Sequence, residues 1–106
     1  MTPRLTYLSE LLATSPDDSF LLFAVAKEHE KAGDLAHAIV FYEKIRAADP
    51  AYIGLYYHLG KLHEQRQDIE SAVAVFRQGI AAARAANDGH AESELRGALM
   101  NWEDPE

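Results

Sequence analysis

The stretch Ala51–Ala86, AYIGLYYHLGKLHEQRQDIESAVAVFRQGIAAARAA, decides the fold. Its apolar residues recur at helical spacing on both sides of Gln67-Asp68, which predicts two helices folded back on each other. The residues before this stretch repeat its pattern at an offset of 34 positions, so that Leu22 aligns with Tyr56. A repeat of this length is typical of arrays in which helix pairs stack on one another.

The residues that the two copies share are those that pack a helix pair. In the first copy the identical residues are Leu21, Lys27, His29, Glu30, Asp34, Ala38, Ala47, Ala48 and Ala51. Ala26 and Gly60 also align, and both are small enough to let two helix backbones approach closely. Tyr42 and Phe76 are expected to fill the space beside these small residues.

The joint spacing resembles the tetratricopeptide repeat family, whose pattern is W-x2-L-G-x2-Y, then A-x3-F, then P. The second copy matches this pattern as Tyr56-x2-Leu59-Gly60-x2-His63, followed by Ala72-x3-Phe76. The first copy matches it as Leu22-x2-Val25-Ala26-x2-His29, followed by Ala38-x3-Tyr42 and the closing Pro50. The departures are Leu22 and Tyr56 for Trp, His29 and His63 for Tyr, and Arg84 for the second closing proline. The resemblance covers residues 19–86 and implies an all-α, right-handed superhelix of antiparallel helix pairs, with about six helices.

We predict one domain over residues 1–106. It consists of an N-terminal half-repeat or capping helix (3–15), repeat one (19–52), repeat two (53–86) and a C-terminal capping helix (88–102). Within the repeats, helices are expected at about 20–31, 35–48, 53–66 and 69–86, and the last helix at 90–102. Thr2-Pro3 provides a cap and a first-turn proline for the first helix. Residues 104–106 are expected to fray, and the initial Met and acidic end favour a whole protein over a cut-out domain.

Composition limits the function classes. Hydrophobic residues make up 48% and charged residues 25%, as in ordinary soluble domains. There is no cysteine, which excludes disulfides, and no apolar run reaches the roughly 18 residues of a membrane span. The N-terminus lacks a signal peptide, so a cytoplasmic location is expected. The net charge is −7, concentrated after residue 86, which argues against nucleic acid as a partner.

No catalytic residue, cofactor or metal site is predicted. His58 and His63 lie five positions apart and therefore on different helix faces, unlike the i, i+4 pair of a metal-binding helix. The resemblance implies that His29 and His63 occupy the inward aromatic position of the repeat. No Ser-His-Asp or glycine-rich phosphate pattern occurs in the sequence. An enzymatic or metal-binding role is therefore the third hypothesis.

The resemblance implies a concave groove lined by the first helix of each repeat. Its positions are Phe20, Phe23, Lys27, Glu30 and Lys31 in repeat one, and Gly54, Tyr57, Lys61, Glu64 and Gln65 in repeat two, with Tyr52 near the junction. The alignment of Phe23 with Tyr57 and of Lys27 with Lys61 predicts an aromatic row beside a lysine row. Such a surface suits a peptide with apolar and acidic anchors. The alternative is that Phe20 and Phe23 are partly buried against the first helix and the lysines are solvated.

These observations favour a non-catalytic protein–protein interaction module, an adaptor or scaffold without nucleic-acid or membrane partners. The second hypothesis is a self-associating protein whose exposed aromatic residues or Trp102 form a homodimer interface. Members of the family that grip the C-terminal carboxylates of heat-shock chaperones use Lys and Asn at the fifth and ninth positions of their first unit. Phe23 and Lys27 stand there in this chain, so that clamp is not predicted.

Overall fold

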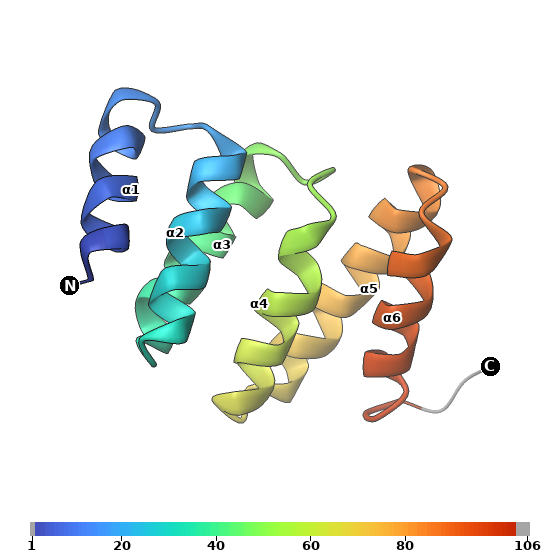
Figure 1. The fold of residues 1–106 in the computed structure, drawn as a ribbon. Helices are drawn as coiled ribbons and strands as arrows, with labels where there is room; N and C mark the ends of the chain where they lie inside the picture. Colours follow the sequence, from blue (N-terminus) through green and yellow to red (C-terminus); the bar gives the residue numbers. More distant parts are fainter. Residues whose placement is uncertain (1, 104–106) are drawn as a thin grey trace. The chain divides into compact units, whose positions relative to one another are not determined.

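The computed structural model describes residues 2–103, which form six α-helices and no strand (Figure 1). This confirms the all-α class predicted from the sequence. The chain divides into two units, one ending at Pro50 and the other beginning at Ala51, and each is described by itself. The single domain and the superhelical handedness stay predictions. Residues 104–106, which were expected to fray, lie outside the described residues.

The first unit contains α1 (Pro3–Thr14), α2 (Ser19–Lys31) and α3 (Leu35–Ala48), and α2 packs against both of its neighbours. The Thr2 hydroxyl accepts the backbone N–H of Leu5 at 3.1 Å, and Pro3 occupies the first turn, as predicted for the start of this helix. The buried apolar residues of the unit are Leu5, Leu8, Leu22, Val25, Ala26, Ala38, Tyr42 and Ile45. They tie the half-repeat α1 to the complete helix pair that follows it.

The second unit contains α4 (Gly54–Gln65), α5 (Ile69–Ala85) and α6 (Gly89–Leu99), with α5 packed against both α4 and α6. Its buried apolar side chains are Leu55, Tyr56, Leu59, Leu62, Ala72, Val75, Phe76, Ile80, Ala83, Leu95 and Ala98. The last helix ends at Leu99, and the prediction that it continues to Trp102 is wrong. After Leu99 the chain turns, with the Trp102 backbone N–H donating to the Leu99 carbonyl at 2.9 Å. This turn lets the Trp102 indole donate to the Glu64 carboxylate on α4.

The small residues kept at the 34-residue offset lie where two helices touch, which confirms their predicted role. Ala26, Ala38 and Ala72 are fully buried, and Gly60 is buried as well. A Cβ atom on Gly60 would lie 2.2 Å from the nearest atom of the Phe76 ring. Phe76 therefore fills the space that the missing side chain of Gly60 leaves open.

Three turns of the chain share one backbone geometry: those between α2 and α3, α4 and α5, and α5 and α6. Each has a residue with positive φ, namely Gly33 (79°), Gln67 (61°) and Asn87 (56°), followed by an aspartate that caps the next helix. The aspartate N–H donates at 2.9 Å to the carbonyl five residues earlier in all three turns. This is the Schellman arrangement, which satisfies helix-end carbonyls through a left-handed residue.

The same turn geometry lowers the pKa values of two of the capping carboxylates. The pKa of Asp34 lies below its ordinary value because the carboxylate accepts the backbone N–H of His37 and then a contact from the His37 side chain. The pKa of Asp68 is also lowered, first by the Ser71 hydroxyl and then by the Ser71 backbone N–H. Both aspartates are therefore ionised at neutral pH, and ionised caps stabilise a helix N-terminus.

The positive φ of Gln67 gives a prediction about stability. The side chain of Gln67 makes the left-handed conformation costly, whereas Gly33 adopts it freely in the equivalent turn. Gln67→Gly is expected to raise the free energy of unfolding by about 0.5–1 kcal/mol, measured by urea denaturation. The reciprocal control, Gly33→Gln, should lower it. If Gln67→Gly destabilised the protein, the left-handed conformation at this position would be wrong.

No helix in residues 2–103 combines the length and the apolar character needed to cross a membrane.

Candidate partner-binding site

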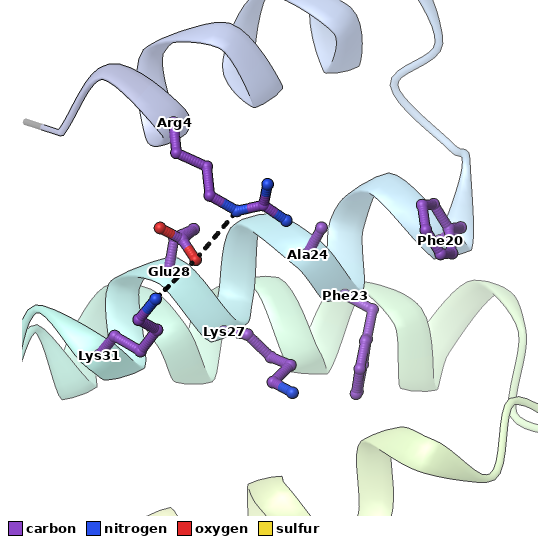
Figure 2. Close-up of a pocket in the computed structure, with 7 residues that line it drawn as sticks. All are labelled: Arg4, Phe20, Phe23, Ala24, Lys27, Glu28 and Lys31. Carbon is purple, nitrogen blue, oxygen red and sulfur yellow. Dashed lines mark ion pairs between the residues drawn. The ribbon is translucent and has the colours of Figure 1, made fainter.

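A pocket of about 400 Å³ lies on the first unit, between the start of α1 and the length of α2 (Figure 2). Its floor and rim combine aromatic side chains with charged ones: the lining residues are Arg4, Phe20, Phe23, Ala24, Lys27, Glu28 and Lys31. Four of them, Phe20, Phe23, Lys27 and Lys31, are positions that the family resemblance assigned to the groove. The structure thus brings the predicted first-repeat residues together at one hollow, with the exception of Glu30.

The pocket is lined by more positive than negative side chains. Arg4 Nε lies 3.3 Å and Lys31 Nζ 3.7 Å from the same oxygen of Glu28, whose side chain is only 10% exposed. Figure 2 shows Arg4 reaching from α1 and Lys31 from the end of α2 toward this one carboxylate. Within residues 2–103, Lys27 makes no ion pair. The pocket therefore holds three cations and one carboxylate, in a chain whose net charge is −7.

The aromatic residues of the pocket differ in exposure. Phe20 is 70% exposed, which excludes the alternative that it is buried against the first helix. Phe23 is half-buried, and its ring meets the ring of Tyr42 on α3 edge-on, with centroids 5.7 Å apart. The Lys27 ammonium lies 5.7 Å from the Phe23 centroid, and both side chains leave the same side of α2 one turn apart (Figure 2). Phe23 is thus a fixed surface, and Phe20 is available for contact.

The equivalent residues of the second unit are arranged differently. Lys61 lies 5.9 Å from the Tyr57 centroid, as Lys27 lies over Phe23, but Lys61 also forms an ion pair with Glu64 at 2.8 Å. The pKa of Lys61 is raised, chiefly by its hydrogen bond to Glu64. Its charge is therefore compensated within the unit. Tyr52 is partly buried and Gln65 is exposed, and neither lines the pocket on α2.

Glu30 and Glu64, the predicted acidic groove residues, both have partners inside their own unit. The Tyr42 hydroxyl donates to Glu30 at 2.9 Å. Glu64 accepts the Trp102 indole N–H and pairs with Lys61. The contact of either carboxylate with a partner protein stays a prediction.

Sequence reasoning missed three of the residues that line the pocket: Arg4, Ala24 and Glu28. Arg4 belongs to the half-repeat α1, and its position over α2 depends on how these two helices pack. The spacing of residues in the sequence does not predict that packing. Glu28 lies one position after Lys27, and only its low exposure distinguishes it from other surface carboxylates. Neither residue could have been assigned without the tertiary structure.

The fold is that of a helical-repeat protein, and the pocket lies on the first helix of a repeat. Residues 30–92 match the family model of the tetratricopeptide repeat. A crystal structure of a tetratricopeptide repeat domain protein from Salinibacter ruber is 37% identical, with a TM-score of 0.76 over 79% of this chain and 93% of that one. A solution NMR structure of a tetratricopeptide repeat domain protein from the same organism is also 37% identical, with a TM-score of 0.77 over 81% of this chain and 87% of that one.

No curated protein matches the chain. The family match and the two structures show that the chain belongs to the tetratricopeptide repeat family. Proteins of this family are generally protein–protein interaction modules and generally act as scaffolds without catalysis.

Proposed function

We propose that this protein is a non-catalytic adaptor whose α2 pocket binds a segment of another protein through an apolar anchor and nearby carboxylates. The observation that carries the proposal is the 70% exposed Phe20 at the edge of a pocket with three cations and one carboxylate. Exposed aromatic residues beside a hollow are common binding hot spots. The absence of cysteine supports a cytoplasmic location for this adaptor.

The charge pattern supports an acidic partner. Glu28 already holds Arg4 and Lys31, so an incoming carboxylate would meet Lys27 first and could then share the other two cations. Because the rest of the chain is acidic, this local positive surface also orients an acidic segment toward the pocket. A basic segment would meet repulsion in the pocket.

The apolar part of the pocket supports a large anchor side chain. Ala24 follows Phe23 on α2, and its small side chain leaves room in the pocket. The volume of about 400 Å³ accommodates an aromatic or branched aliphatic residue. Phe23 is held by Tyr42, so it needs little ordering when the anchor arrives. A surface that is ordered in advance loses less conformational entropy on binding.

Selection of a random peptide library displayed on phage against the immobilised full chain tests this function. The enriched peptides are expected to combine an aromatic or large aliphatic residue with Asp or Glu within a few positions. The variant Arg4→Glu, Lys27→Glu should not enrich them, and circular dichroism should show it folded. Enrichment of basic peptides, or equal enrichment by both proteins, would contradict the proposal.

Self-association is a second candidate, favoured by apolar residues on the exposed side of α1. Tyr7 is 61% and Leu11 37% exposed, and they lie one helical turn apart, so they form a small apolar stripe. Two such stripes could pair in a symmetric dimer. If so, sedimentation velocity should show a concentration-dependent dimer in the wild type and a monomer in Tyr7→Ser, Leu11→Ser. A wild type that stays monomeric at every concentration tested would exclude this function.

A further inference from the structure

Two imidazoles and a carboxylate converge at the turn between α2 and α3. His37 Nδ1 lies 2.7 Å and His29 Nδ1 3.7 Å from the same oxygen, Oδ2 of Asp34. One ligand atom from each of the three residues lies within 4.8 Å of the other two. The three residues do not follow a metal-binding spacing along one helix. His29 lies near the end of α2, and His37 lies in the first turn of α3. The hairpin alone brings them together.

Each of the three side chains is held by a separate feature of the hairpin. The His29 ring lies nearly parallel to the Phe41 ring, with centroids 5.4 Å apart, and its side chain is only 15% exposed. Asp34 uses Oδ1 to accept the His37 backbone N–H at 3.2 Å, which leaves Oδ2 to face the imidazoles. His37 is 64% exposed, so the cluster is open to solvent on that side.

We propose that His29, Asp34 and His37 form a binding site for a divalent transition-metal ion of the Zn²⁺ type. Imidazole nitrogen and carboxylate oxygen are ligands that Zn²⁺ uses commonly, at about 2.0–2.2 Å. Ligand atoms around a tetrahedral ion at those distances lie about 3.4 Å apart, a value between the 2.7 Å and 3.7 Å seen here. The remaining coordination position is open to water or to a group from outside.

Metal binding requires one local movement. The rings of His29 and His37 are stacked, with centroids 5.2 Å apart and planes 24° apart, so their lone pairs do not yet meet at one point. The exposed His37 ring can tilt about its own side-chain torsion without disturbing the core. His29 and the Asp34 cap stay in place. The site is therefore largely preformed, and the flexible ligand is the one at the surface.

Two other turns of the chain have the same backbone geometry but fewer potential ligands, so they serve as internal controls for this site. The three equivalent turns place residues 29, 34 and 37, then 63, 68 and 71, then 83, 88 and 91 in the same backbone positions. Their side chains are His-Asp-His, His-Asp-Ser and Ala-Asp-Ala. The N–H of the last residue donates to the aspartate Oδ1 at 3.2, 3.2 and 3.0 Å, so the backbones agree. The turns thus offer three, two and one potential ligands on one scaffold.

The test is a titration of the untagged full chain with ZnCl₂ by isothermal calorimetry. The wild type should bind one ion. His37→Ser, which gives the first turn the side chains of the second, should bind it at least about tenfold more weakly, because losing a ligand costs no less than losing an outer-shell partner. Ser71→His, which completes His63 and Asp68, should bind two ions. Zinc should also raise the melting temperature of the wild type more than that of His37→Ser.

His58→Gln and His90→Gln are matched controls, since each removes an imidazole outside the cluster and should leave zinc binding unchanged. Circular dichroism should show that all four variants are folded. Absence of zinc binding by the wild type, or equal binding by wild type and His37→Ser, would overturn the proposal. A Ser71→His variant that gains no second site would show that the turn geometry does not build the site. The outcome is independent of the partner-binding function, which concerns other residues.

Discussion

The double variant Phe20→Ala, Lys27→Glu is expected to bind an acidic, aromatic peptide about a hundredfold more weakly than the wild type, or worse. Phe20 is 70% exposed and its ring borders the pocket, so removing it deletes contact area without opening the core. Truncation of an aromatic hot-spot residue typically costs about 2 kcal/mol or more. Reversal of the Lys27 charge adds repulsion of the peptide carboxylate, and the two effects together exceed the roughly 2.8 kcal/mol of a hundredfold change.

The measurement is fluorescence anisotropy with a labelled peptide from the phage selection. The chain offers a matched control in Tyr7→Ala, Lys44→Glu. Tyr7 is 61% exposed, and Lys44 lies over the Phe41 ring at 4.8 Å, so this variant loses the same kinds of group outside the pocket. It should bind within about twofold of the wild type, because isolated surface changes have small effects. If the two double variants lost affinity equally, the peptide would bind by overall charge, and the pocket would not be the site.

The salt dependence of binding distinguishes the two contributions. The Lys27 contribution is electrostatic and at the surface, so it should weaken between low salt and about 0.5 M, where the Debye length is only a few ångströms. The Phe20 contribution should persist over that range. Phe20→Ala alone should therefore keep the salt dependence of the wild type, and Lys27→Glu alone should reduce or invert it. Equal salt dependence of both single variants would contradict this division.

The helices and their core could be predicted because local spacing dictates them. Ala38 and Tyr42, and Ala72 and Phe76, are one turn apart, and their burial follows from helical periodicity once the offset of 34 is known. The last helix was predicted too long because Leu95, Leu99 and Trp102 continue a helical spacing. A periodic pattern does not reveal that Trp102 leaves the helix to reach Glu64.

The site was predicted less completely because equivalent positions acquire different partners. Glu30 and Glu64 align at the offset of 34, yet Glu30 accepts the Tyr42 hydroxyl, whereas the aligned Phe76 has no hydroxyl to donate. Glu64 instead accepts the Trp102 indole and holds Lys61. The two aligned carboxylates therefore have different partners, and in the described part of the chain only Glu64 forms an ion pair with the lysine three residues before it. Sequence alignment of the repeats treats Lys27 and Lys61 as equal, and the structure does not.

Gly79→Ala is expected to lower the free energy of unfolding by about 1–2 kcal/mol, although alanine is the better helix former. A Cβ at this position would lie 2.5 Å from Cβ of Tyr56 and 3.0 Å from Cδ1 of Leu95. The first atom is fixed to the α4 backbone, so no rotamer change relieves the contact, and α4 or α5 must move. Overpacking of this kind costs about 1–3 kcal/mol and occasionally more, which outweighs the roughly 1 kcal/mol gained in helix propensity.

Gly97→Ala is the matched control, because Gly97 is also inside a helix but a Cβ there would have no neighbour within 4 Å. It should raise the free energy of unfolding by up to about 1 kcal/mol through helix propensity alone. Urea denaturation should therefore separate the two alanine variants by about 2–3 kcal/mol, in opposite directions from the wild type. If both variants were stabilised, α4 and α6 would not approach α5 as closely as described. The sign of the Gly79 effect thus measures whether close helix contact, rather than helix propensity, determines the residue at this position.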